Sequence, residues 1–176
     1  MTRETGASLA GRISTSLFAR TPLILQSEAA ECGLAAMAMV AGHHGHRMDM
    51  AAIRRRFSAS IKGTTLRDLV SVGSGLGLAT RALRLEPGDL GKLRLPCILH
   101  WGHNHFVVLT KVRNGSIVIH DPAKGRRTVP MAEVSRQMTG VALEAWPAEG
   151  FTRRDETARL RAVSYTHLTL PTILLV

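Results

Sequence analysis

The sequence predicts an α+β domain in which helices of the first half pack on an antiparallel sheet formed by the second half. Up to residue 77, apolar side chains recur at the three- and four-residue spacing of buried helix faces. After residue 79, short apolar segments alternate with turns, and Asn114-Gly115 is a strong signal for a β-hairpin. Helices followed by hairpin-connected strands are typical of the α+β class.

Three helices are expected in the first half. The first ends near Gly42, the second has Asp49 as its N-cap, and Thr65 with Asp68 forms a capping box for the third. Glycines after residue 72 end the third helix. The side chains expected to face inward are Leu34, Met37, Ala38 and Ala41 in the first helix, Met50, Ile53 and Phe57 in the second, and Leu66, Leu69 and Val70 in the third.

The second half is expected to form the sheet. A turn at 87–89, followed by a single helical turn, separates the first strand from the others. The segment 105–112 is too apolar to be exposed on either face of a sheet. The expected strands are 79–85, 97–101, 105–112, 116–121, 126–129 and 141–146, with a helix at 131–138 before the last strand.

Both ends of the chain differ from its middle. We expect a flexible segment at 1–20, a domain at 21–150, and a charged linker with an uncharged tail at 151–176. No segment has the run of about 18 apolar residues that a membrane span requires. The first residues also lack the continuous apolar core of a secretory signal.

Composition narrows the function classes. The chain has 23 Lys and Arg against 13 Asp and Glu, a net charge of +10, with small clusters at 54–56, 126–127 and 153–154. No run interleaves these with aromatic residues, so single-stranded nucleic acid is not the expected partner, and an anionic lipid surface is at least as plausible. Cys32 and Cys97 are the two cysteines, too few for a disulfide framework, which favours a reducing compartment.

Four residues could form a catalytic group. Cys32 lies near the amino end of its helix, where unpaired backbone N–H groups favour a thiolate nucleophile. His105 opens an apolar strand and Asp121 ends the other arm of the hairpin, so the two side chains can meet as base and orienting carboxylate. Gln26, in the loop before the helix, could donate its amide N–H to an oxyanion beside the Cys32 N–H. This chain order is that of papain-like cysteine hydrolases.

Each of these residues also has a structural interpretation. A cysteine in a helix of Ala, Leu and Met is most often a core residue, and Asp121-Pro122 is also a common turn. Cys97, in a strand, is expected in the core. Histidines at close spacing could instead bind zinc, but no Cys-x-x-Cys, HExxH or carboxylate set completes such a site. The histidines concerned are His43, His44, His46, His100, His103 and His105.

The chain from about Leu25 to Phe151 resembles the C39 cysteine peptidase domains at the amino end of bacteriocin-exporting ABC transporters, the colicin V secretion type most closely. The resemblance rests on QSEAAECGLAAMAMVAGHHG, DMAAIRRRFSASIKGTTLRDLV, LRLPCILHWGHNHFVVL, IVIHDPAKGRR and TGVALEAWP. It implies a papain-like fold and cleavage of a precursor's leader peptide after a Gly-Gly pair. The implied roles are nucleophile for Cys32, base for His105, orienting carboxylate for Asp121 and oxyanion donor for Gln26.

The resemblance also implies partners. These are a precursor peptide and the transmembrane and ATPase domains of a parent transporter, assembled as a homodimer at the cytoplasmic face of the bacterial inner membrane. No cofactor is expected in this chain, since it lacks a G-x-x-x-x-G-K-(S/T) motif, and ATP would bind only to the ATPase domain. The alternative is a docking domain that binds leaders without cutting them.

Overall fold

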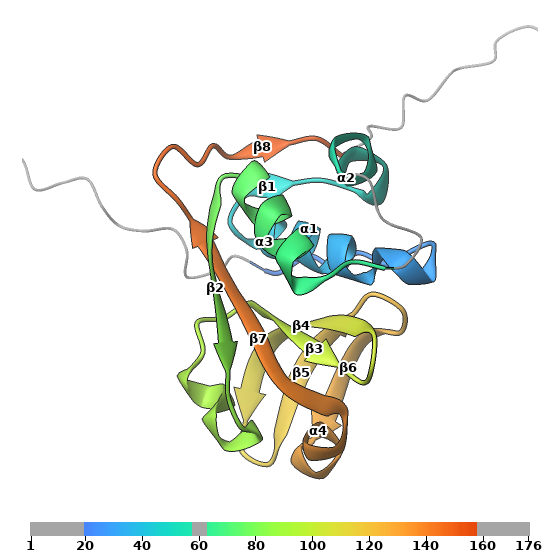
Figure 1. The fold of residues 1–176 in the computed structure, drawn as a ribbon, viewed down its shortest axis with the longest axis vertical. Coiled ribbons are helices and arrows are strands. Elements are labelled where there is room, and N and C mark those ends of the chain that lie inside the picture. The colour runs from blue at the N-terminus through green and yellow to red at the C-terminus, as the bar shows by residue number, and fades with distance from the viewer. Residues whose placement is uncertain (1–19, 58–62, 158–176) are drawn as a thin grey trace, which may run out of the picture.

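The computed structural model describes residues 20–57 and 63–157 (Figure 1). The helices of the first half gather on one side of the strands, and a short helix of the second half, α4, lies at the opposite end of the molecule. The expected flexible segment, apart from Arg20, and the tail beyond Thr157 lie outside the described residues. Within these residues, no helix is long and apolar enough to cross a membrane.

The second half forms a six-stranded sheet in the order β2-β7-β3-β4-β5-β6, with every neighbouring pair antiparallel. The expected strands are confirmed, and the last begins earlier than expected because its first residues pair with β3. The strands are β2 (Leu78–Arg84), β3 (Cys97–Trp101), β4 (His105–Arg113), β5 (Ser116–Asp121), β6 (Gly125–Pro130) and β7 (Met138–Pro147).

Two of the helices begin where their capping residues indicate. The Asp49 carboxylate accepts a hydrogen bond from the Ala52 N–H at 2.7 Å, and Thr65 and Asp68 form the expected capping box. The helices are α1 (Cys32–His43), α2 (Met50–Arg56), α3 (Leu66–Gly75) and α4 (Met131–Gln137), with 3₁₀ turns η2 (Ala29–Glu31) and η3 (Pro87–Lys92).

Helix α1 is buried on every side, whereas its apolar spacing predicted a single inward stripe. All residues from Cys32 to Gly42 are buried, because the helix lies between the sheet and helices α2 and α3. Two glycines of the helix also let the flanking segments at Pro22 and Thr64 approach closely. A Cβ atom at Gly42 would lie 2.7 Å from Cγ of Pro22, and one at Gly33 would lie 2.9 Å from Cβ of Thr64.

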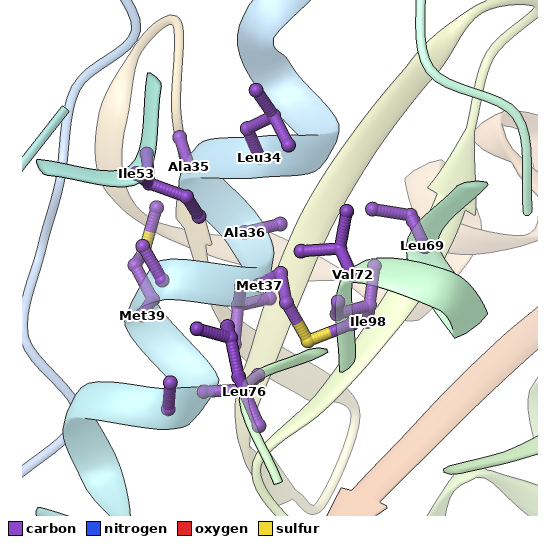
Figure 2. Packing of buried hydrophobic residues seen from close by; sticks show 14 of the residues in the cluster. Leu34, Ala35, Ala36, Met37, Met39, Ile53, Leu69, Val72, Leu76 and Ile98 are labelled. Atoms are coloured by element: carbon purple, nitrogen blue, oxygen red, sulfur yellow. The ribbon is translucent and has the colours of Figure 1, made fainter. Parts of the chain in front are cut away.

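The sheet buries both of its faces. On the helical face, Met37 of α1 lies among Val72, Leu76 and Ile98 (Figure 2). The opposite face is covered by η3 and α4, which bury a second cluster. The main members of that cluster are Leu90, Cys97, Leu99, Trp101, Val107, Leu109, Ile117, Ile119, Val129, Val134 and Ala142. The first half of β4 is buried on both faces, as its sequence predicted. From Thr110 onward the strand is partly buried or exposed, with Lys111 exposed, so the prediction of burial over the whole of 105–112 was wrong for its second half.

Three expected core positions differ. Leu66, the first residue of α3, is only partly buried at the edge of the helical cluster. Val70 is 38% exposed, because Leu69 and Val72 are the residues of α3 that face α1 and the sheet. Phe57 follows the end of α2 and is only partly buried at the edge of the helical cluster.

Residues 151–157, the beginning of the expected linker, are packed on the helical layer. Phe151 joins the helical core cluster, and β8 (Arg154–Asp155) pairs in parallel with β1 (His46–Arg47). The Glu156 carboxylate lies 3.0 Å from Nε2 of His46 and 3.2 Å from Nη1 of Arg56. An aromatic anchor and these ion pairs account for the docking of a segment whose sequence is mostly charged.

Candidate active site

Cys32 is the first residue of α1, as the sequence predicted, and only 3% of its surface is exposed. The 3₁₀ turn η2 leads directly into the helix, so the thiol lies at the end where backbone N–H groups are free of intrahelical partners. Its Sγ lies 3.9 Å from the carbonyl oxygen of Asn104, in the turn between β3 and β4. The thiol therefore faces the residue that precedes His105.

His105 and Asp121 form a hydrogen-bonded pair. His105 opens β4 and Asp121 ends β5, and Nε2 of the imidazole donates to Oδ1 of the carboxylate at 2.8 Å. The Asp121 side chain is 2% exposed, and its Oδ1 also accepts the Ala123 N–H at 2.9 Å. The carboxylate is thus fixed by its own turn as well as by the histidine.

This arrangement favours a protonated imidazole. The hydrogen bond to Asp121, followed by one to Cys32, raises the pKa of His105 to about 9 despite the opposing effect of burial. Burial raises the pKa of Asp121, but hydrogen bonds from His105 and from the backbone N–H groups of Ala123 and Lys124 outweigh it and lower the pKa. The pair is therefore an imidazolium with an ionised carboxylate, and Cys32 is the other partner of the imidazole.

Gln26 is held against the same turn. Its backbone N–H donates to the carbonyl oxygen of Pro122 at 2.9 Å, directly after Asp121 in the chain. Its side-chain Oε1 is buried and has no hydrogen-bond partner within residues 20–57 and 63–157. The structure thus brings Gln26, Cys32, His105 and Asp121 together at one end of α1.

Two groups near the site were not anticipated. The Asn104 carbonyl contacts the Cys32 thiol, and Nη1 of Arg127 lies 4.0 Å from Oδ2 of Asp121. Arg127 is also held by Glu133, at 3.0 Å from its Nη2. The sequence showed Arg127 only as part of a basic cluster, and nothing in its spacing indicated which carboxylate it would face.

A cavity of about 350 Å³ opens beside the pair. It is lined by His105 and Asp121 and, among others, by Trp101, Lys124 and Arg127. A larger cavity, of about 610 Å³, contains none of the four candidate residues. Cys32 and Gln26 are not among the lining residues of the smaller cavity, so this cavity adjoins the base and its carboxylate rather than the thiol.

Four of the histidines outside this group have separate partners. His43 shares a hydrogen bond with Thr21, His44 donates to the Ala145 carbonyl, and His46 pairs with Glu156. His100 lies 2.8 Å from Oγ1 of Thr139. In the described part of the chain, no three His, Cys, Asp or Glu side chains are grouped as a metal site would require. Cys97 is fully buried, and burial raises its pKa to about 12.

The sequence profile described as the peptidase C39 family matches residues 20–150. The chain belongs to the peptidase C39 family. Among curated proteins, it is 49% identical over 142 residues to the colicin V secretion/processing ATP-binding protein CvaB of Escherichia coli. It is 47% identical over 141 residues to the probable microcin-H47 secretion/processing ATP-binding protein MchF of the same species. These alignments cover 81% and 80% of this chain, but only 20% of each relative.

Solved structures agree with this membership. A double glycine motif protease from an AMS/PCAT transporter, crystallised in complex with the leader peptide, has a TM-score of 0.69 and 37% identity. The match covers 74% of this chain and 94% of that protease. The peptidase domain of Streptococcus ComA has a TM-score of 0.66 and 26% identity, over 73% and 99% of the two chains. The papain-like α+β fold expected from the sequence is confirmed.

Proposed function

We propose that this domain is a cysteine endopeptidase that removes double-glycine leader peptides from peptide precursors during export by an ABC transporter. The observation that carries the proposal is the hydrogen-bonded series from Cys32 through His105 to Asp121 at the start of α1. The similarity to a double glycine motif protease solved with its leader peptide supports the substrate class.

The first half of the reaction would be acyl transfer to sulfur. The Cys32 thiolate attacks the carbonyl carbon of the second glycine, and the resulting oxyanion accepts hydrogen bonds from the Cys32 backbone N–H and the Gln26 amide. Protonated His105 gives its proton to the departing amine as the peptide bond breaks. The cargo leaves with a free amino terminus, and the leader remains on Cys32 as a thioester.

The second half would be hydrolysis. His105, now neutral, takes a proton from water, and the hydroxide attacks the thioester carbonyl. The leader leaves with a free carboxylate, and the thiolate–imidazolium pair is restored. Asp121 keeps the imidazole oriented through both halves, because its Oδ1 is held by the Ala123 N–H as well as by Nε2 of His105.

The substrate's two glycines give a steric basis for selectivity. If the cleft around the last two leader residues is too narrow for a side chain, a Cβ atom at either position would collide with its walls. Most other peptides would then be excluded. The remainder of the leader would then supply affinity by laying the apolar face of a helix on the domain.

The partners follow from the relatives. The two curated relatives are named as secretion/processing ATP-binding proteins, and this chain spans about a fifth of their length. We propose that the parent protein carries transmembrane and ATPase domains, assembles as a homodimer, and holds this domain at the cytoplasmic face of the bacterial inner membrane. Its substrate would be a precursor of a bacteriocin or similar peptide.

The test is cleavage of a synthetic leader that ends in Gly-Gly and is followed by a short cargo, read by mass spectrometry under reducing conditions. We expect a single cut after the second glycine for wild type and none for Cys32→Ala or His105→Ala. The same peptide with the second glycine replaced by alanine serves as the substrate control. Binding of the intact peptide by wild type without any cut would favour the docking domain instead and would contradict the peptidase proposal.

A further inference from the structure

Glu31 is a buried charge directly before the nucleophile. Only 4% of its surface is exposed, although ionised side chains are rarely buried without partners. It has no part in the chemistry proposed above, since neither the base nor the oxyanion donors involve its carboxylate. Its contacts therefore call for a separate explanation.

The Glu31 carboxylate holds the loop that precedes it. Oε2 accepts the backbone N–H of Ser27 at 3.0 Å and that of Glu28 at 3.0 Å. The second of these belongs to a capping box around η2. The Glu31 side chain therefore holds the beginning of the short loop that runs from Ser27 to Glu31, directly before Cys32.

Arg54 of α2 completes the arrangement. Its Nη2 donates to Oε2 of Glu31 at 2.7 Å, and its Nε donates to Oε1, which is the two-point geometry that a guanidinium offers a carboxylate. The hydrogen bond from Arg54, together with those of the two backbone N–H groups, outweighs burial and lowers the pKa of Glu31 to about 2. The carboxylate is therefore ionised, and its charge is neutralised beside Cys32.

These contacts fix the residue expected to stabilise the oxyanion. The Gln26 N–H donates to the Pro122 carbonyl at 2.9 Å, and the next N–H along the chain, that of Ser27, donates to Glu31 at 3.0 Å. Gln26 is therefore tethered on both sides of its Cα atom. One tether leads to the turn that holds Asp121, and the other to the residue that precedes Cys32.

We propose that Glu31, held by Arg54, is a positioning residue that keeps Gln26 in place to stabilise the oxyanion. This inference rests on the proposed peptidase function. The carboxylate acts through the backbone of the Gln26–Ser27 peptide and does not touch the substrate. Loss of the tether would leave the thiol and imidazole in place while displacing one oxyanion donor.

The test compares Glu31→Gln and Arg54→Lys with Arg55→Lys. Arg55 is the matched control, because it is an exposed neighbour on α2 without a hydrogen bond or ion pair to any described residue. For Glu31→Gln, we expect kcat in peptide cleavage to fall roughly 10- to 100-fold with KM within about 2-fold, because small displacements of positioned groups mainly affect the transition state. Arg54→Lys keeps the charge but loses the two-point contact, and should give a smaller loss.

A second readout separates positioning from a general structural role. Alkylation of Cys32 by iodoacetamide needs the thiolate but forms no oxyanion. We therefore expect its rate and pH profile to stay within about 2-fold of wild type in both variants. A parallel fall in alkylation and cleavage would mean that the variants disturb the whole site, and it would overturn the proposal.

The third readout is a double-mutant cycle with Gln26→Ala. If Glu31 acts through Gln26, then Glu31→Gln should reduce kcat by no more than about 3-fold in the Gln26→Ala background. Full additivity of the two effects, or wild-type kcat in Glu31→Gln, would overturn the positioning role while leaving the peptidase intact. Absence of cleavage by wild type would instead overturn the proposed function, and this inference with it.

Discussion

His105 and Asp121 meet across a hairpin only because β4 contains one extra residue. Next to the Asn114-Gly115 turn, Arg113 pairs with Ser116 and Lys111 pairs with Val118. If this register continued along the strands, Asp121 would lie opposite Val108. The register shifts at Thr110, so that Val108 pairs with His120 instead. A one-residue shift exchanges the two faces of a strand, and here it turns Asp121 to the face that carries His105. Their atoms Nε2 and Oδ1 then lie 2.8 Å apart.

The raised pKa of His105 predicts the alkaline limit of activity. Its pKa is raised from 6.5 to about 9, so the imidazolium needed to protonate the leaving amine is lost above that pH. We expect kcat/KM for peptide cleavage to fall on the alkaline side with an apparent pKa near 9. In Asp121→Asn, the apparent pKa of this alkaline decrease should move toward the ordinary histidine value, since the largest cause of the shift is removed. An unchanged apparent pKa for the alkaline decrease in that variant would contradict the role given to Asp121.

The same shift predicts how stability depends on pH. A histidine whose pKa is higher in the folded state stabilises the fold fully below its unfolded pKa of 6.5, and this contribution is lost as pH rises through about 9. We expect the free energy of unfolding to fall by about 1–3 kcal/mol between these pH values. Denaturant unfolding of wild type and His105→Gln at several pH values measures it. A slope that persists in the variant would assign the effect to other groups.

Gln26→Ala tests the oxyanion donor. Removal of one such donor lowers kcat by about 10²- to 10³-fold in enzymes that stabilise a tetrahedral oxyanion. We expect a loss of this size with little change in KM, because the donor acts on the transition state rather than on the bound peptide. Steady-state kinetics on the Gly-Gly peptide gives both constants. A loss confined to KM would mean that Gln26 binds substrate instead.

The two cysteines should differ sharply in reactivity. Both thiols are largely buried, with Cys97 0% and Cys32 3% exposed. Burial raises the pKa of Cys97 to about 12, whereas Cys32 is adjacent to a protonated imidazole. Iodoacetamide should therefore add one carboxamidomethyl group to the native protein, on Cys32, and a second only after unfolding in guanidinium. Peptide mapping locates the modified residue. Rapid labelling of Cys97 in the native state would contradict the packing described for β3.

Met37 tests the helical core. Its side chain is fully buried among Val72, Leu76 and Ile98 (Figure 2), so Met37→Ala leaves a cavity that rigid neighbours only partly fill. We expect the free energy of unfolding to fall by about 2–5 kcal/mol. Val70→Ala on α3 is the control, since Val70 is 38% exposed, and it should change stability by less than about 1 kcal/mol. Equal effects of the two substitutions would contradict the assignment of the core.

Local sequence signals predicted most of the fold. Capping residues such as Asp49 and Thr65 specify where helices begin, and Asn114-Gly115 specifies a hairpin, because each depends on contacts within a few residues. The amino-end position of Cys32 could be predicted for the same reason. The hairpin also predicted that His105 and Asp121 lie at the same end of the two strands, but the face they share depends on the extra residue at Thr110.

The remainder depends on contacts between distant segments. Complete burial of α1 follows from its packing against the sheet on one side and against α2 and α3 on the other. The spacing of apolar residues within one helix does not reveal this packing. The extra residue at Thr110 and the docking of Phe151 and Glu156 also arise from long-range pairing. The tether from Glu31 to the Gln26–Ser27 peptide could not be inferred from spacing either, because its partner Arg54 lies on another helix.

The most direct test of the central claim is detection of the covalent intermediate on Cys32. Wild type is mixed with the Gly-Gly leader–cargo peptide, quenched in acid within the first turnovers, and its intact mass is measured. We predict an adduct equal to the leader acyl group, joined to Cys32 through the last glycine and absent in Cys32→Ala. Continued cleavage by Cys32→Ala, or an adduct on any other residue, would contradict the assignment of Cys32 as the nucleophile.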